Sequence, residues 1–464
     1  MSSHQHLSRK HYDMLSCGDL SARRLIQQLF EHLLEICPTC RQEWKEMHLP
    51  GPRAGATRRT VPRPPSQPCL SPEKPALDAT FARVFGRISK LQQQVALDRQ
   101  GAGDLLRELL AIPDPKDRIK RVKKSHRFRS WALCERLFLE SQRAAFSSPD
   151  DAQALAELAI ETAWSLDDGS RSQRAISDLL AQGWATLANA RRTASDLDGA
   201  EETFFMASFF LEQGTGDPMV LAEVLDLEAS LRRDQRQLTT SLRLLDRVLN
   251  IYRRIGEDHL RGRTLLSKAI TVAEGGDAAA GLDLLEQGFN LIDESRDSRL
   301  TLCFHHTRIL FINQLGRHRE AFQLILELAP RYDAFPDAWT QLRRRWLTGE
   351  IAEGLGRDAA AEEAFRAVRQ GFIEQGIGYD AALASLHLAA LYFRQGRSQE
   401  IKQLASQMLP IFQSRDIHRE AIAALLLFQK AAQMETVTAE MIQSLKRFLI
   451  RARGSSEVPS EVPS

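Results

Sequence analysis

Apolar residues recur along most of this chain at the three- and four-residue intervals of amphipathic helices, from Leu77 to about Arg453. Four glycines at intervals of 40 residues each end one helical pattern before another begins: Gly276, Gly316, Gly356 and Gly396. Glycine readily takes the left-handed conformation that closes a helix, so each of these positions predicts a turn between two helices. The pattern therefore predicts a chain built from repeated helical pairs.

Three further rows of apolar or small residues follow the same register. The row before the turn consists of Ala188, Ala229, Ala269, Ile309, Gly349 and Ala389. The row just after the turn consists of Ala200, Ser241, Gly281, Ala321, Ala361 and Ile401. Four residues later in each unit come Phe204, Leu245, Leu285, Ile325, Phe365 and Ala405. Small residues let paired helices approach, and one hairpin cannot bury its apolar face alone, so we expect neighbouring units to stack.

In this register the chain resembles the tetratricopeptide repeat family. The first unit shows the family spacing most fully, with Trp184, Leu187, Ala188, Ala200, Phe204 and Ala207. The period of 40 exceeds the family's usual length of about 34 residues, which implies longer helices. The resemblance implies an all-α solenoid of helical hairpins with a right-handed curve, whose concave surface holds a protein or peptide.

Composition and the repeat register together divide the chain into six expected segments. They are a polar helical module at 1–48, a flexible Pro/Arg-rich linker at 49–78, a helical lead-in with an irregular first hairpin at 79–179, the tetratricopeptide-like repeats at 180–417, capping helices at 418–453 and a disordered tail at 454–464. The linker and tail are rich in Pro, Ser and charged residues, which favour extended, uncompacted chain.

The repeat register places ten residues on the inner helices, where they would line a partner-binding groove. They are Asn189, Arg192, Arg233, Arg263, His306, Asn313, Arg343, Trp346, Glu350 and Phe393. Arginine and tryptophan dominate binding hot spots, so this composition suits a peptide. Each residue could instead be solvent-facing or cover the stem of its hairpin. For His306, next to His305, the pattern favours partly buried helix packing over a site.

Charge, apolar stretches and motifs bear on the class of partner, the location and the presence of enzymatic activity. The 62 Lys and Arg nearly balance the 60 Asp and Glu, so bulk charge indicates no polyanionic partner. The basic stretch from Lys116 to Arg129 favours a solvated helix face over a nucleic-acid contact. No apolar stretch is long enough to cross a membrane, and no secretory signal follows the first residues, so we expect a cytoplasmic location. Catalytic motifs such as HExxH, a P-loop or GxSxG are absent, so no enzymatic activity is predicted.

The N-terminal segment holds one candidate metal site. Cys37 and Cys40 are separated by two residues, so their thiolates can hold one ion from a single turn, and His32 can add a third ligand. His6 and Cys17 are the candidates for the fourth ligand. A metal-free helical bundle and a redox dithiol are the alternatives, but a redox motif would call for a neighbouring βαβ pattern.

This segment resembles the zinc-binding anti-sigma-factor module, a small helical domain of bacteria. The resemblance is carried by His6-Leu-Ser, Leu15, Gly18-Asp19-Leu20-Ser21, His32-Leu33, Cys37 and Cys40. It implies a structural Zn²⁺ held by His6, His32, Cys37 and Cys40, although thiolate affinity alone would favour Cys17 over His6. Four residues separate His32 from Cys37 here, one more than the family usually has.

These patterns together predict a non-enzymatic scaffold or adaptor that binds a protein or peptide partner in the groove of a repeat solenoid. The alternative is a transcription regulator, in which the N-terminal module binds a sigma factor and the repeats sense a signal. A second docking module on the same chain would let the protein bring two partners together.

Overall fold

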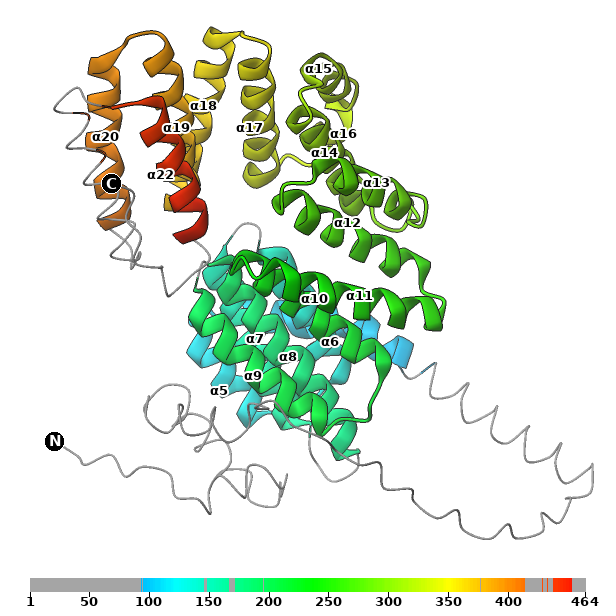
Figure 1. The fold of residues 1–464 in the computed structure, drawn as a ribbon. Coiled ribbons are helices and arrows are strands. Elements are labelled where there is room, and N and C mark those ends of the chain that lie inside the picture. Colours follow the sequence, from blue (N-terminus) through cyan, green and yellow to red (C-terminus); the bar gives the residue numbers. More distant parts are fainter. Residues whose placement is uncertain are drawn as a thin grey trace, which may run out of the picture. The chain divides into compact units, whose positions relative to one another are not determined.

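The computed structural model divides the chain into two compact units, Met1–Gln100 and Gly101–Ser464. The structure describes residues 93, 95–145, 148–166, 172–194, 196–375, 377–413, 428, 432 and 437–452. Within these residues every regular element is a helix and there is no strand. The all-α fold class is therefore confirmed (Figure 1).

Within the part of the chain from Gly101 to Ser464, several helices precede the repeats. They are α5 (Pro115–Lys124), the short 3-10 helix η3 (His126–Phe128), α6 (Trp131–Ala144) and α7 (Pro149–Ser165). Ser130 and Ser148 cap α6 and α7 by accepting hydrogen bonds from backbone N–H groups in the first turn. Helices α6 and α7 pack against each other ahead of the repeats.

Six helical pairs follow in the described residues. The first helices of the units are α8 (Gln173–Thr193), α10 (Pro218–Asp234), α12 (Asp258–Glu274), α14 (Ser298–Gln314), α17 (Ala338–Gly354) and α19 (Gly378–Arg394). The second helices are α9 (Leu197–Glu212), α11 (Leu238–Ile255), α13 (Ala278–Phe289), α15 (His318–Glu327), α18 (Asp358–Glu374) and α20 (Ser398–Gln413). In each unit the two helices contact each other, and five of the second helices also contact the first helix of the next unit. This is the stacking that the repeat register predicts.

The turns between paired helices use the predicted glycines. Gly276, Gly316, Gly356 and Gly396 all have positive φ, from 67° to 103°. The residue after each glycine donates its N–H back to a carbonyl of the preceding helix, as Arg357 does to Ala352 at 2.9 Å. At the matching position of the second unit Arg236 takes a φ of 62° without being glycine.

The rows of small residues lie where the paired helices touch. Ser241 donates its hydroxyl to the backbone oxygen of Ala229 at 2.8 Å, which satisfies a polar group at this buried contact. Its counterpart in the next unit is Gly281, where an added Cβ would lie 3.0 Å from the backbone oxygen of Ala269. All members of the three rows are buried, so the register predicted from the sequence is confirmed.

The fourth unit departs from the regular pattern. Pro330 cannot donate a backbone hydrogen bond and clashes with the preceding turn, so α15 ends at Glu327 and a short helix, α16 (Ala329–Asp333), follows. The break places Tyr332 in the core, where 1% of its surface is exposed. Its hydroxyl meets His306 of α14, at the face described next.

Candidate partner-binding face

The side chains that α8, α10, α12, α14, α17 and α19 turn away from their paired helices form a surface that we call the first-helix face. All ten residues predicted to line the groove lie on these helices. Arg343 and Phe393 are exposed, Asn313 is buried, and the other seven are half-buried. The structure therefore distributes the predicted residues over one row of helices and does not gather them at one centre.

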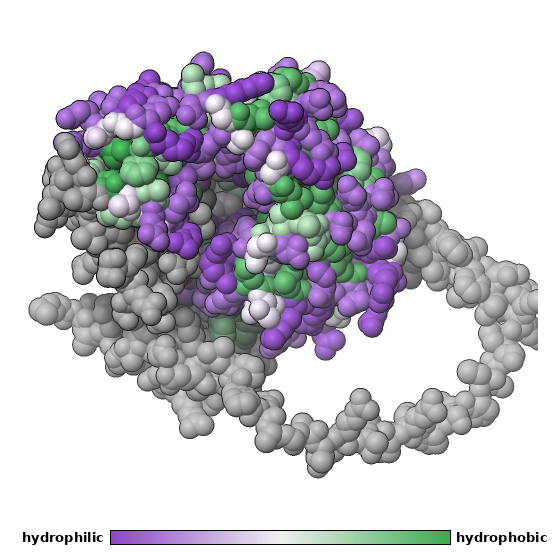
Figure 2. All heavy atoms as spheres, turned by 45° about the horizontal axis from the view of Figure 1, so that its top comes forward, coloured by the Kyte–Doolittle hydropathy of each residue, from purple (hydrophilic) through white to green (hydrophobic). Residues whose placement is uncertain are grey.

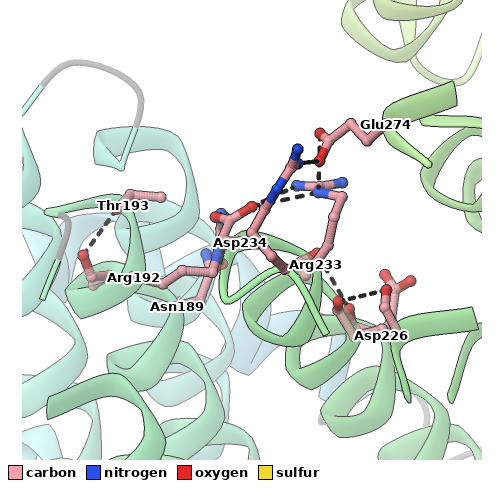
Figure 3. Close-up of polar contacts among 12 residues, drawn as sticks. Asn189, Arg192, Thr193, Asp226, Arg233, Asp234 and Glu274 are labelled. Carbon is pink, nitrogen blue, oxygen red and sulfur yellow. Dashed lines mark hydrogen bonds and ion pairs between the residues drawn. The ribbon is translucent and has the colours of Figure 1, made fainter. Parts of the chain in front are cut away.

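A ladder of ion pairs joins the first three units (Figure 3). Arg192 of α8 pairs with Asp234 at the end of α10, and Asp234 also pairs with Arg233 at 3.3 Å. Arg233 in turn lies 3.7 Å from Glu274 of α12. Asn189 supports the ladder, because its side-chain oxygen accepts a hydrogen bond from Arg192 at 3.0 Å. These pairs connect each unit of the three to its neighbour.

A second polar group lies on α10 and α12. Arg263 pairs with Asp226 at 2.8 Å, and this carboxylate raises the pKa of the guanidinium. Burial raises the pKa of Glu223, which opposes the effect of a hydrogen bond from Gln182 at 2.6 Å. The predicted Arg263 is therefore fixed by an acidic partner and is not available to bind a second carboxylate without exchange.

Two predicted residues of α14 have structural roles. The Nδ1 atom of His306 lies 2.9 Å from the Tyr332 hydroxyl. Burial, aided by the charge of Arg343, lowers the pKa of His306 to about 3, so the ring is neutral near pH 7. The buried Asn313 is hydrogen-bonded at 2.7 Å to His318, the first residue of α15. Both side chains are engaged within the fold.

The fifth unit presents an aromatic and basic stripe along α17. Trp339, Arg343 and Trp346 follow one another at intervals of four and three residues, so they share one side of the helix. The Arg343 guanidinium lies 5.9 Å from the centre of the Trp339 ring. Arg343 has no acidic partner at ion-pair distance in the described part of the chain, whereas Arg192, Arg233 and Arg263 each have one.

Glu350 and Glu353 of α17, with His387 of α19, form what we call the acidic cluster. The Trp346 indole donates to Glu350 at 2.9 Å, and His387 lies 3.2 Å from Glu353 and 3.9 Å from Glu350. Arg394 pairs with Glu353 at 2.9 Å. The cluster therefore links the last two units as the ladder links the first three.

The pKa values of the two carboxylates of the acidic cluster are shifted in opposite directions. Burial raises the pKa of Glu350. Burial acts in the same direction on Glu353, but the hydrogen bonds from His387 and Arg394 outweigh it and lower its pKa to about 2. Glu353 is therefore firmly ionised near pH 7, and Glu350 is the less strongly stabilised anion.

The surface is mostly polar. Figure 2 shows a predominantly hydrophilic face on which hydrophobic side chains form separate patches. Phe393 is the one predicted groove residue that is both apolar and exposed, at 38%. Contact with a partner at the ten predicted positions would therefore rest mostly on charged, polar and aromatic side chains.

Most acidic residues of this face were not predicted from the sequence. They include Asp234, Glu274 and Glu353, and the neighbouring His387 was not predicted either. A signal was present, because Asp234 follows Arg192 and Glu274 follows Arg233 by just over one repeat. Opposite charges at that spacing lie on adjacent first helices.

The basic stretch predicted from the sequence lies within the described residues. In the basic stretch, Arg121 and Arg127 pair with Glu108, and Lys123 pairs with Glu161 at 3.2 Å. Much of that charge is thus balanced within the fold.

The predicted zinc ligands His6, His32, Cys37 and Cys40, like Cys17, lie outside the described residues. In the described residues no helix is long and apolar enough to span a membrane.

Comparison with known proteins identifies the fold. No protein-family model and no curated protein matches the chain. Among solved structures the chain is similar to a Rap protein complexed with competence and sporulation factor, with 12% sequence identity and a TM-score of 0.53. The match covers 69% of this chain and 87% of that one. At this identity the likeness shows the fold alone, a tetratricopeptide-like helical solenoid.

Proposed function

We propose that this protein is a non-enzymatic adaptor that binds a protein or peptide segment along the first-helix face. The observation that carries the proposal is Arg343, an exposed cation beside Trp339 and without an acidic partner in the described residues. Arginine and tryptophan contribute more binding energy than other residues at interfaces. A carboxylate on the partner would supply the missing ion pair.

The spread of the face supports a chain-like partner over a small molecule. Charged and aromatic residues extend from Arg192 on α8 to Phe393 on α19, and they do not converge on one point. The similar Rap protein was solved in complex with a factor, which fits a binding role for this fold. An extended segment could contact several units at once.

Affinity capture with matched variants tests this proposal. Arg343→Glu replaces the free cation with a carboxylate, so we expect proteins captured by the wild type to be lost, with binding weakened about tenfold or more. Arg345→Glu is the control, because Arg345 is exposed on the same helix but two residues away and therefore on another side. If both variants capture the same proteins as the wild type, the first-helix face is not the binding surface.

A regulator of the anti-sigma type is the alternative. It rests on the resemblance carried by His32, Cys37 and Cys40, which lie outside the described residues. In that case a sigma factor would be captured by the full chain and lost from the double variant Cys37→Ser, Cys40→Ser. Arg343→Glu would leave this capture unchanged, which separates the two proposals.

A further inference from the structure

The C-terminal helix α22 (Ala439–Ala452) packs against α19. Figure 1 shows it in red beside α19. Three apolar residues at intervals of three and four, Ile442, Leu445 and Leu449, are at most 7% exposed. They belong to the same hydrophobic cluster as Leu386 and Ala389 of α19. Because α19 is the first helix of the last described unit, α22 packs on one of the helices that carry the first-helix face.

Lys446 follows directly after Leu445 on α22. Its ammonium attracts the carboxylates of Glu350 and Glu353, and burial lowers the pKa of Lys446. Yet Lys446 makes no direct hydrogen bond or ion pair with the part of the chain that the structure describes. A half-buried charge without a direct partner is unfavourable, so within the described residues the charge complementarity of this contact is incomplete.

The apolar residues of α22 are well packed at this site, but its lysine lacks a direct partner among the described residues. It brings three apolar anchors and one cation to a surface that offers an apolar patch and two carboxylates. A helix of 14 residues is marginally stable in water on its own, so its order depends on this contact. A partner helix with a better-placed cation would compete for the same surface.

We propose that α22 is an internal ligand of the first-helix face, which an amphipathic basic helix of a partner displaces. The partner helix would carry apolar residues at positions i, i+3 and i+7, as α22 does, and Lys or Arg at i+4. Recognition of an amphipathic helix through such spaced anchors is a common binding mode. The inference extends the proposed function, because it assigns a partner chemistry to the C-terminal end of the same face.

A peptide of residues 437–452, labelled with a fluorophore, tests the inference on the full-length protein. Lys446→Glu places a third carboxylate against Glu350 and Glu353, so α22 should leave its site and the peptide should bind about tenfold tighter than to the wild type. Arg447→Glu makes the same charge change at an exposed neighbouring position and should leave peptide affinity unchanged. Equal peptide affinity for wild type and Lys446→Glu, or no binding to either, would overturn the proposal.

The acidic cluster provides a second comparison. A labelled peptide that itself carries Lys446→Glu, added to the Lys446→Glu chain, lacks the attraction of Glu350 and Glu353, so we expect it to bind about tenfold more weakly than the peptide with lysine. Unchanged affinity would show that the carboxylates do not recognise the cation. Peptide affinity is measured on chains that keep Arg343, so failure here and failure of the Arg343-dependent capture are distinguishable.

Hydrogen exchange of the wild-type protein requires no variant. If α22 is a displaceable ligand, its backbone amides should exchange at least tenfold faster than those of α19. Equal protection of the two helices would mean that α22 is a fixed end of the solenoid. A loss of helicity in Lys446→Glu that extends beyond α22 would lead to the same conclusion.

Discussion

The residue that stands out in the backbone is Arg236. It occupies the turn position at which the next four units have glycine, and it takes a left-handed φ of 62°. A side chain in this conformation is strained by about 1 kcal/mol. Its guanidinium also pairs with Glu274 at 2.6 Å, so the ion pair offsets part of the strain.

Two substitutions at Arg236 separate these effects. Arg236→Ala and Arg236→Gly both lose the ion pair with Glu274, but only glycine relieves the left-handed backbone. We expect the glycine variant to be more stable than the alanine variant by about 1 kcal/mol, measured by urea unfolding. An alanine variant of equal or greater stability would show that the turn is not strained.

The ionisation of Glu353 gives a pH dependence. Its pKa of about 2 lies below the ordinary value of 4.5, so its contribution to stability is complete above pH 4.5 and is lost as the pH falls toward 2. We expect Glu353→Gln to destabilise the protein by about 1–3 kcal/mol at pH 7, and the difference from wild type to shrink below pH 4.

Thermal unfolding across this pH range measures the effect of Glu353→Gln. Glu320→Gln is the control, because Glu320 pairs with Arg317 at the exposed surface and such pairs contribute little. A gap between Glu353→Gln and wild type that stays constant from pH 7 to pH 3 would contradict the assignment.

Part of the residue-scale structure could be predicted and part could not. The turn glycines and the buried small residues follow from periodicity, because backbone conformation and close helix contact restrict residue type strongly. The acidic partners of Arg192 and Arg233 do not follow from periodicity, because pairing of charges depends on how adjacent helices are rotated about their axes. That rotation is set by packing of the whole unit, and a local sequence pattern does not determine it.

At the scale of elements, the contact between paired helices limits side-chain size. Ala361 and Ala389 have no exposed surface, and both belong to the rows that predicted the repeat. Replacing either by leucine should overpack the contact and destabilise the protein by about 1–3 kcal/mol. The melting temperature reports the loss.

Ala360 supplies the matched control for this prediction. It lies next to Ala361 on α18 but is exposed, so Ala360→Leu should leave the melting temperature nearly unchanged. If Ala361→Leu and Ala389→Leu also melt with the wild type, the assigned contacts are wrong.

The elements also show the limits of pattern-based prediction. Helical pairs and their turns were predicted, and so was the hairpin before them. The break at Pro330 could have been predicted from proline chemistry, but its result, the burial of Tyr332 against His306, could not. The position of α22 on α19 was not predicted either, because amphipathicity reveals an apolar side of a helix but not the surface that covers it.

At the scale of the molecule, the repeat solenoid is confirmed in the described residues, and the N-terminal module stays a prediction. One Zn²⁺ per chain is expected, held by His32, Cys37 and Cys40 with His6 or Cys17 as the fourth ligand. Elemental analysis of protein prepared without chelators measures the stoichiometry. Cys37→Ser with Cys40→Ser should abolish bound zinc and leave the helical signal of the repeats intact.

The fourth ligand can be assigned by two single variants. Zinc lost from His6→Ala but kept in Cys17→Ala would support the ligand set of the anti-sigma-like module. The reverse result would favour the thiolate. A wild-type protein that contains no zinc would exclude the metal site and leave a metal-free bundle as the explanation of the N-terminal pattern.

The ion pairs between first helices have a consequence for how such a protein can change by duplication. Because Arg192–Asp234 and Arg233–Glu274 join residues about one repeat apart, the second unit contributes one side of a bridge to the unit before it and one to the unit after. A duplicate of this unit would therefore bring both halves of its own junctions. The chain could gain or lose 40 residues at a time, which would lengthen or shorten the first-helix face by one unit while the cores of the remaining units keep their packing.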